Sequence, residues 1–388
     1  MEPTLAPEHQ NVVDAAATFA REVVAPQAAT WEQARSMPVA TLRAAAEAGL
    51  TGLLLPAEAG GHGLSYTAMA RVMEEMAAAD MAFAFSLVVH NNLMGNIAAN
   101  GDAAQQARHL PALLAGERIG AFLLTEPSGG SDAAAIRTRA VRDGDGWRLD
   151  GAKAWVTNAA HADLLSVYAQ TEPEEGWRGI ACFLVDAEAP GVVREPPYSL
   201  LGGHAMGAGG FGFEAVRVTD ADMLVPPGRG FKAAMAGIDL ARANVAAMCC
   251  GMLRTGLDVA LRQASARMAF GQPVAAFQGL QWQLADVATD LHAARLMAYA
   301  ATQGIDRDGA APLAAAHAKK FATRVALTGL SQCMQALGAD GLKQEHPLAR
   351  HLAGAKIAQY LDGTTEIQNV VISRALLKPY LPAGGAAG

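Results

Sequence analysis

Two short segments of the 388-residue chain carry residue types that suit binding of a phosphate group. The first, Thr125–Asp132, reads T-E-P-S-G-G-S-D and follows the apolar run Ala121–Leu124. Glycine lets the backbone approach a ligand closely, and successive N–H groups in such a loop can bind a phosphate. Thr125 and Ser131 add hydroxyl groups. By itself the segment also fits an ordinary turn, which is the commoner meaning of this pattern.

The second segment, Asp150–Asn158, reads D-G-A-K-A-W-V-T-N. Side chains alternate between the two faces of a strand, so we expect Trp155 and Thr157 to point the same way. A flat aromatic ring beside a hydroxyl group suits the edge of a planar ring system. A tryptophan in a strand is, however, more often a core residue.

Two other kinds of site are not favoured. The segment Gly207–Gly212 has the G-x-G-x-x-G spelling, but a dinucleotide fingerprint needs a strand before it and a helix after it. Here a strand, Phe211–Val218, is expected to follow, so we interpret the segment as a glycine-rich loop. The histidines are scattered, without an H-E-x-x-H or a Cys/His cluster, so we expect no catalytic metal.

Hydrophobic periodicity divides the chain into three zones that would position these segments. Residues 1–120 and 231–388 have helical spacing, whereas 121–230 has short apolar or alternating runs between turn residues. This order predicts an α+β fold. The expected strands are Ala121–Leu124, Trp147–Leu149, Trp155–Thr157, Leu164–Ala169, Ile180–Val185 and Phe211–Val218. The expected long helices are 231–267, 278–304, 311–337 and 347–377, the last broken near Gly363. We expect the tail Pro382–Gly388 to be disordered.

Composition indicates an ordinary globular protein. Hydrophobic residues make up 52% of the chain and charged residues 17%, which disfavours disorder, and the net charge of -7 argues against nucleic acid as a partner. No C-x-x-C pair occurs among the four cysteines, so we expect buried, reduced thiols. The N-terminus has no signal-peptide pattern, and the longest apolar run that we identified, Met81–Val89, is too short to cross a membrane. We therefore expect a soluble cytoplasmic protein.

Taken together, T-E-P-x-x-G-S-D and G-x-K-x-W-V-T-N resemble the flavin-binding β-domain of the acyl-CoA dehydrogenase family. Further segments resemble that family in the same order along almost the whole chain. They are Leu55–Tyr66, Asp239–Arg242, Arg267–Gly271 with Phe277 and Gln278, Gln335–Gly338, and Asp362–Gln368. The resemblance implies an N-terminal helical domain (1–120), a central antiparallel β domain for flavin and substrate (121–230) and a C-terminal four-helix-bundle-like domain (231–388). It also implies FAD as the cofactor and an FAD-dependent oxidation of the Cα–Cβ bond of an acyl-CoA thioester to the 2-enoyl thioester.

The resemblance assigns roles to individual positions of this sequence. The positions implied for the flavin ring and pyrophosphate are Leu124, Thr125, Gly130, Ser131, Trp155 and Thr157. Those implied for the ADP portion are Arg267, Phe270, Gln278, Gln335 and Gly338, and Thr364 and Glu366 would close over the FAD. Substrate contacts are implied for Ser131, Asp239 and Arg242. In the family the ADP-binding residues come from a neighbouring subunit, so a homo-oligomer, a dimer or tetramer, is implied.

The resemblance also implies that Asp362 is the catalytic base, at a position where the family usually has Glu. The carboxylate would remove the α-proton while hydride leaves Cβ for N5 of FAD. The thioester carbonyl would be hydrogen-bonded by the backbone N–H of residue 362 and a ribityl hydroxyl. Some relatives place the base on the long helix after the β domain, but Ala241 stands there and cannot act. The alternative is that Asp362 merely caps the following helix, since Asp is a good N-cap.

Several functions fit these features. The leading one is a dehydrogenase that passes electrons to an acceptor such as electron-transferring flavoprotein. A same-fold enzyme acting on carrier-protein thioesters has no sequence feature against it. A nitroalkane-oxidase-like enzyme would also use an Asp base, but it has an Arg where this chain has Asn369. A non-catalytic paralogue is opposed by the intact flavin motifs and the net charge of -7. Acyl chain length and branching stay open.

Overall fold

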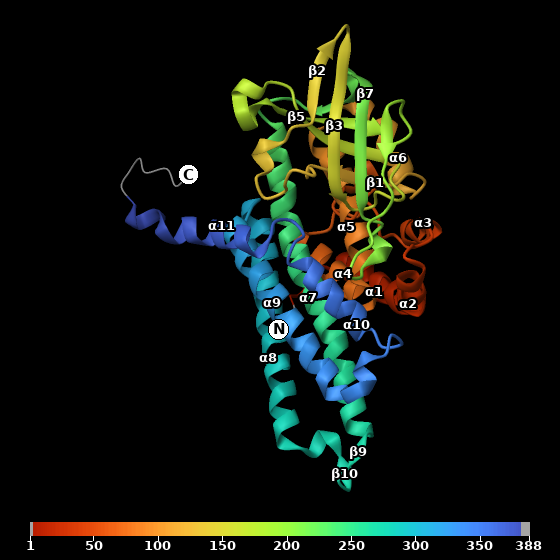
Figure 1. Ribbon diagram of the computed structural model, residues 1–388, viewed down its shortest axis with the longest axis vertical. Coiled ribbons are helices and arrows are strands. Elements are labelled where there is room, and N and C mark those ends of the chain that lie inside the picture. The colour runs from red at the N-terminus through yellow and green to blue at the C-terminus, as the bar shows by residue number, and fades with distance from the viewer. Residues whose placement is uncertain (1–2, 382–388) are drawn as a thin grey trace. The chain divides into compact units, whose positions relative to one another are not determined.

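The computed structural model describes residues 3–381, and Figure 1 shows its elements. The expected tail Pro382–Gly388 lies outside the described residues. Helices come first: α1 (Pro7–Phe19), α2 (Ala25–Ala34), α3 (Ala40–Glu47), α4 (Tyr66–Ala79), α5 (Met81–Asn100) and α6 (Ala103–Leu114). The strands follow: β1 (Gly120–Leu123), β2 (Arg139–Asp143), β3 (Gly146–Val156), β4 (Leu164–Gln170), β5 (Ile180–Asp186), β6 (Val192–Arg194), β7 (Gly209–Thr219) and β8 (Met223–Val225). The rest of the chain contains α7 (Gly230–Ala266), the short hairpin β9 (Met268–Ala269) and β10 (Gln272–Pro273), then α8 (Gln278–Asp308), α9 (Pro312–Leu337), α10 (Leu348–Ala358) and α11 (Thr365–Leu377).

The strands β1–β8 form one sheet in the order β6-β7-β3-β2-β4-β5-β8, with β1 paired to β4. Most pairs are antiparallel, but β1 and β2 each run parallel to β4. The glycine-rich segment Gly207–Gly212 was predicted to be a loop, but β7 already begins at Gly209, so only its first two residues precede the strand. Because a strand and not a helix follows, the dinucleotide fingerprint is excluded. The predicted α+β class is confirmed.

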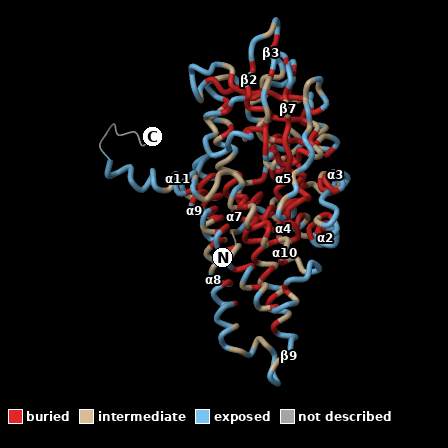
Figure 2. Tube along the Cα trace, viewed as in Figure 1, coloured by how far each residue is buried: buried red, intermediate tan, exposed pale blue. Residues whose placement is uncertain are grey.

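Both faces of the middle of the sheet are buried. In β4, Leu165 and Val167 belong to an apolar cluster with Phe183 and Phe211. The alternate residue Tyr168 belongs to a second cluster that includes residues of α5 and α6. A strand covered on both faces is apolar at nearly every position, which is why β4 and β5 appear in the sequence as nearly continuous apolar runs. Figure 2 shows this burial along the strands and the exposed turn between β2 and β3.

By contacts the chain divides into two compact units, which we describe separately. The sheet unit contains Ala6–Ser65 and Ala82–Ile238, and the helical unit contains Tyr66–Met81 together with the chain from Asp239 onward. The helix α4 therefore belongs with the C-terminal helices. The domain boundaries expected from the sequence stay a prediction.

A buried ionic network ties α4 to α7 and α8 within the helical unit. The carboxylate of Glu74 is 1% exposed and accepts hydrogen bonds from Nε of Arg295 and the hydroxyl of Tyr299, both at 2.8 Å. Both oxygens of Glu75 accept from Arg254 at 2.6–2.7 Å. Bidentate pairs of this kind fix the relative rotation of the helices that carry them.

One helix, α7, is long and apolar enough to cross a membrane by length and composition. However, 61% of its most apolar window is buried within the fold, as in the core helix of a globular domain. All four cysteines are buried: Cys182, Cys249, Cys250 and Cys333.

The sequence misplaced some strands. It predicted separate strands at Trp147–Leu149 and Trp155–Thr157, with turn residues between the expected strands, but the structure has one continuous strand, β3. The register of β3 against β7 shifts between Leu149 and Gly151, which indicates a bulge rather than a turn. The break in the last helix near Gly363 is confirmed, because α10 ends at Ala358 and α11 begins at Thr365.

Close packing of α4 on α7 gives a first prediction. A Cβ added at Gly251 would lie 2.1 Å from the carbonyl oxygen of Glu74, so the two helices would have to separate. Overpacking of this kind costs about 1–3 kcal/mol, and we expect Gly251→Ala to lower the melting temperature. Gly237 in the same helix has open space around it, so Gly237→Ala should raise stability by about 0.5–1 kcal/mol. Equal melting temperatures for the two variants in a thermal scan would contradict the packing argument.

Candidate active site

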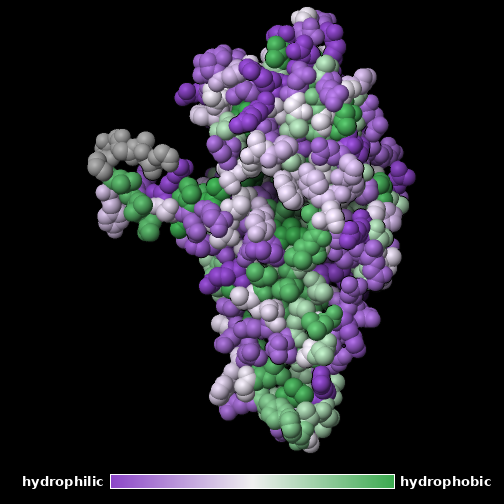
Figure 3. Space-filling view, viewed as in Figure 1, coloured by the Kyte–Doolittle hydropathy of each residue, from purple (hydrophilic) through white to green (hydrophobic). Residues whose placement is uncertain are grey.

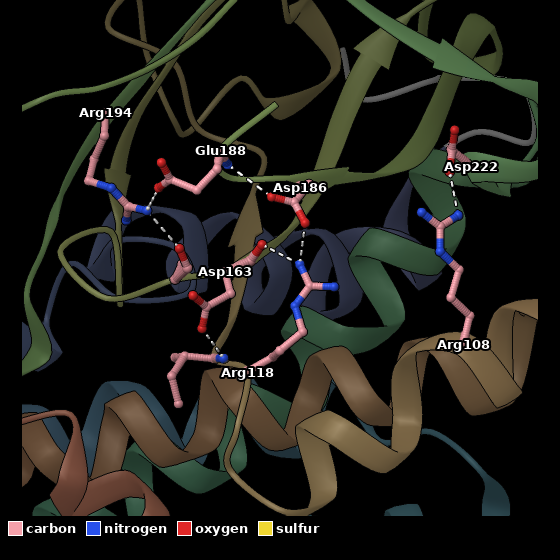
Figure 4. Close-up of polar contacts among 9 residues, drawn as sticks. Arg108, Arg118, Asp163, Asp186, Glu188, Arg194 and Asp222 are labelled. Atoms are coloured by element: carbon pink, nitrogen blue, oxygen red, sulfur yellow. Dashed lines mark hydrogen bonds and ion pairs between the residues drawn. The ribbon is translucent and has the colours of Figure 1, made fainter. Parts of the chain in front are cut away.

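One group of the predicted site residues lies at the end of β1 in the sheet unit. Charged groups hold the start of this strand, as Figure 4 shows. The guanidinium of Arg118 donates to the backbone carbonyl of Asp163 and to the carboxylate of Asp186, both at 2.7 Å. The carboxylate of Asp163 accepts the backbone N–H of Ile119 at 2.7 Å. These contacts fix β1 at one end. Leu124, directly after its other end, is 4% exposed and belongs to the apolar cluster that contains Tyr168, and the loop follows it.

A buried ion pair holds the loop that follows β1. The ammonium of Lys153 donates to the carboxylate of Glu126 at 2.9 Å and to the carbonyl of Leu124 at 3.0 Å. Glu126 also accepts the backbone N–H groups of Arg137 and Thr138. Burial would raise the pKa of the Glu126 carboxyl, but Lys153 and these hydrogen bonds hold it below its usual value. Both residues belong to the two sequence motifs, T-E-P-x-x-G-S-D and G-x-K-x-W-V-T-N, but the motifs assigned no role to either.

Beyond Glu126 the loop is open to solvent. Glu126 and Gly129 exchange two backbone hydrogen bonds, which close a tight turn. Gly130 and Ser131 are exposed, and Thr125 is half-buried beside Gly130. The backbone and hydroxyl groups of this loop are therefore available to a ligand.

Trp155 stands on a bulge of β3. Its backbone is left-handed, with φ 57°, and the register against β7 shifts between Lys153 and Val156. The side chain is 64% exposed and contacts the ring of Tyr198, with 4.9 Å between centroids. Thr157 lies beyond the end of the strand and is buried. The sequence predicted that Trp155 and Thr157 point the same way, because side chains alternate along a strand. That premise is wrong, because the bulge interrupts the alternation.

The positions implied for ADP lie in the helical unit, around the β9–β10 hairpin and the end of α9. All five are exposed: Arg267, Phe270, Gln278, Gln335 and Gly338. Arg267 donates to the carbonyl of Leu337 at 3.0 Å, directly before Gly338. Phe270 is 95% exposed with φ 52° and packs edge-on against Phe277, which precedes Gln278. The fold thus places Arg267 beside Gly338. It also places Phe270 beside the start of α8.

Another group, in the helical unit, surrounds the loop between α10 and α11, which contains Asp362. Arg242 donates from Nε to the carbonyl oxygen of Asp362 at 3.0 Å. Lys319 donates to the carbonyl oxygen of Gly363 at 2.5 Å, and the amide of Gln368 donates to the same oxygen at 2.9 Å. The loop backbone is therefore fixed by donors from α7, α9 and α11.

One carboxylate oxygen of Asp362 has no partner in the fold. Its Oδ2 is shielded from solvent and has no hydrogen-bond partner. Burial raises the pKa of its carboxyl to about 6, although the positive charges of Lys319 and Arg242 favour the ionised form. The alternative that Asp362 caps the following helix is wrong, because Thr364 occupies the N-cap position of α11.

The remaining predicted residues lie close by on the helical unit. Arg242 is 7% exposed and also pairs with Asp239, with 2.7 Å between Nη1 and Oδ1. Burial raises the pKa of the Asp239 carboxyl, and Arg242 opposes that shift. Glu366 is exposed in the first turn of α11, beside Thr364. The implied substrate residues on this unit are thus next to Asp362. Among the described residues, no group of three or more His, Cys, Asp or Glu side chains could hold a metal ion.

The ion pair at Lys153 gives a second prediction. Lys153→Met leaves Glu126 buried without its cation, and removing one partner of a buried pair costs about 3–5 kcal/mol. The double variant Glu126→Leu/Lys153→Met removes both charges, so we expect it to recover part of that loss in urea unfolding. The exposed pair of Arg148 and Asp150 is the control, since Arg148→Met should cost less than about 1 kcal/mol. A double variant no more stable than Lys153→Met would contradict the pairing argument.

The residues present fit FAD. Trp155 and Phe270 are exposed aromatic residues held in a left-handed backbone, a strained conformation that persists where the surroundings enforce it. Neither ring is needed to fill the core. Two exposed rings offer flat surfaces for a planar cofactor, and the open loop at Gly130 offers backbone N–H groups to a pyrophosphate.

Comparison with known proteins identifies the family. Three family models match: acyl-CoA dehydrogenase N-terminal domain (residues 6–117), middle domain (121–216) and C-terminal domain (228–377). The mitochondrial short-chain specific acyl-CoA dehydrogenase of Bos taurus is 36% identical over 373 residues, which cover 96% of this chain and 90% of that protein.

Solved structures agree. Butyryl-CoA dehydrogenase from Megasphaera elsdenii has a TM-score of 0.93 at 31% identity and covers 97% of this chain and 100% of its own. A chain from the structure of the electron transferring flavoprotein of Acidaminococcus fermentans has a TM-score of 0.94 at 34% identity, with 97% and 100% covered. The chain therefore belongs to the acyl-CoA dehydrogenase family and is an FAD-dependent oxidoreductase that dehydrogenates acyl-CoA.

Proposed function

We propose that this enzyme oxidises the Cα–Cβ bond of a short-chain acyl-CoA, with Asp362 as the base that removes the α-proton. The observation that carries the proposal is the Asp362 carboxylate itself. Its Oδ2 is shielded from solvent and has no hydrogen-bond partner, and the loop that bears it is held by two cations. A carboxylate oxygen that the fold leaves without a partner is available for proton transfer.

The chemistry divides between cofactor and protein. FAD supplies the acceptor for the hydride that leaves Cβ. Asp362 accepts the α-proton, which requires the ionised form, and a pKa of about 6 leaves most of the carboxyl ionised at neutral pH. The backbone N–H of residue 362 would donate to the thioester carbonyl and make the α-proton more acidic.

The other site residues would bind FAD and orient the substrate. Leu124, Thr125, Trp155 and Thr157 would contact the flavin ring, and the exposed loop at Gly130 and Ser131 would bind the pyrophosphate. Arg267, Phe270, Gln278, Gln335 and Gly338 would bind the ADP portion, with Thr364 and Glu366 closing over the cofactor. Asp239 and Arg242 lie beside Asp362 and would hold the thioester end of the substrate.

Relatives support a short acyl group. The Bos taurus relative is named for short-chain substrates, and the M. elsdenii structure is of a butyryl-CoA dehydrogenase. Asp362 is one methylene shorter than the usual Glu, which leaves more room beside Cα and would also suit a branched acyl group. We propose electron-transferring flavoprotein as the acceptor, which agrees with the structural match described above. The cytoplasmic location stays a prediction.

We also propose that the enzyme is a homo-oligomer. The hairpin and the start of α8 expose large apolar side chains: Met268 at 62%, Phe270 at 95% and Trp282 at 62%. Figure 3 shows apolar residues gathered on the surface at the hairpin. Clustered exposed apolar side chains of this kind typically mark a protein or ligand interface.

A third prediction tests the base. Asp362→Asn should bind FAD but lose bleaching of the flavin absorbance by butyryl-CoA, because the amide cannot accept the proton. In the unchanged enzyme the rate of bleaching should rise with pH through about 6 and then level off, since only the ionised carboxyl is active. Stopped-flow absorbance under anaerobic conditions measures both. The exposed Asp145→Asn variant is the matched control.

One result would contradict the base assignment, and another would change the substrate. Asp362→Asn that bleaches at the rate of the unchanged enzyme would exclude the residue as base. Flavin reduction by nitroethane or by an acyl-carrier-protein thioester in preference to every acyl-CoA would favour one of the other substrates considered from the sequence.

A fourth prediction concerns the hairpin. Phe270→Asp places a charge on the apolar surface proposed to meet both FAD and a neighbouring subunit, so we expect smaller particles and less bound FAD. Light scattering with size-exclusion chromatography gives the mass, and the ratio of absorbance at the flavin and protein bands gives the FAD content. Val141→Asp, at an exposed apolar residue of β2, should change neither. Unchanged mass and FAD content in Phe270→Asp would contradict the proposal.

A further inference from the structure

Lys319 of α9 is a buried cation that the family motifs quoted above do not include. The residue is 1% exposed, and its neighbours on the apolar face of the helix are alanines: Ala315, Ala316 and Ala322. Burial lowers the pKa of its ammonium to about 8, which still leaves it charged at neutral pH. Burying a lysine is costly unless its charge and its donors are used. Its use must therefore be sought in what it contacts.

The ammonium contacts the loop that carries Asp362. It donates to the carbonyl of Gly363 at 2.5 Å, while Arg242 donates to the carbonyl of Asp362 at 3.0 Å. Asp362 and Gly363 both have left-handed backbones, with φ 51° and 94°. A left-handed non-glycine residue costs free energy, on the order of 1–2 kcal/mol, and so needs contacts that enforce it. Two cationic donors on successive carbonyls supply such contacts.

The same ammonium acts on the carboxylate by charge. Among the groups that influence these two residues, the positive ones are Lys319 from α9 and Arg242 from α7. Glu366 on α11 and the Cys249 thiol on α7 lie near Lys319, and Asp239 is already paired with Arg242. Arg242 is thus shared between a carboxylate and a carbonyl, whereas Lys319 has no carboxylate within salt-bridge distance among the described residues. Lys319 is therefore the cation whose charge is free to favour ionised Asp362.

We propose that Lys319 is a positioning residue for the base: its ammonium holds the left-handed backbone of the Asp362 loop and supplies the positive charge that favours the carboxylate form. The inference rests on the proposed role of Asp362. A purely structural lysine would not affect the pH profile of the reaction. In this proposal the charge of Lys319 acts on the pH profile, while its hydrogen bond acts on the rate reached at high pH.

The experiment compares Lys319→Gln and Lys319→Met in the FAD-loaded enzyme. Both variants lose the charge, but glutamine keeps a hydrogen-bond donor. An opposite charge at about 4–6 Å shifts a carboxyl pKa by about 1–3 units, so we expect the limb near pH 6 to move up by about that amount in both. Bleaching by butyryl-CoA at neutral pH would fall from about twofold to about 100-fold. At high pH, Lys319→Gln should approach the rate of the unchanged enzyme and Lys319→Met should stay below it.

The next residue of the helix provides the control. Lys320 is exposed, so Lys320→Met removes a charge of the same sign from the same helix and should leave the pH limb in place. Melting temperature and FAD content show whether each variant is folded, and Lys319→Gln serves if Lys319→Met does not fold.

The outcomes are distinguishable. An unshifted limb in Lys319→Gln, with Asp362→Asn inactive, overturns the role of Lys319 and leaves the base in place. If Asp362→Asn bleaches normally, the base assignment fails and the role of Lys319 fails with it. The proposal is also overturned if the pH limb of the bleaching rate shifts equally in the Lys319 and Lys320 variants. The loss of any positive charge from α9 would then explain the shift.

Discussion

Buried ammonium groups that hold backbone carbonyls are the interaction on which the candidate residues of each unit depend. In the sheet unit, Lys153 donates to the carbonyl of Leu124 and faces Glu126. In the helical unit, Lys319 donates to the carbonyl of Gly363 and acts on Asp362. Each lysine lies on an element of regular structure and fixes a neighbouring loop. Because a buried charge cannot be left without partners, each loop has little freedom to move away from its cation.

The carboxylates near the two lysines have different functions. Glu126 is paired by hydrogen bonds with Lys153 and two backbone N–H groups, so its pKa lies below the usual value and its function is structural. Asp362 receives charge from its neighbours but its Oδ2 has no hydrogen-bond partner, so burial dominates and raises its pKa. A carboxyl with a raised pKa is a stronger base once it is ionised. A buried lysine near a carboxylate thus gives a structural ion pair in the sheet unit and a carboxylate available as a base in the helical unit.

Left-handed backbone recurs at the proposed functional positions. Trp155, Phe270 and Asp362 all have φ between 51° and 57°. Aspartate adopts this conformation more often than most residues with a Cβ. The short base and the conformation of its loop are therefore physically compatible. The exposed rings of Trp155 and Phe270 are turned outward by backbone that a regular strand or helix would not adopt.

The sequence by itself determined the order of helices and strands, the α+β class and the break before α11, because hydrophobic periodicity and glycine positions are local signals. It also gave the family, through motif residues whose chemistry is local. It did not give the continuity of β3 or the outward turn of Trp155, since a bulge depends on the register of a partner strand. Nor did it exclude Asp362 as a helix cap or give Lys153 and Lys319 their roles. Those depend on contacts between residues 29 and 44 positions apart, which only the tertiary structure brings within hydrogen-bonding distance.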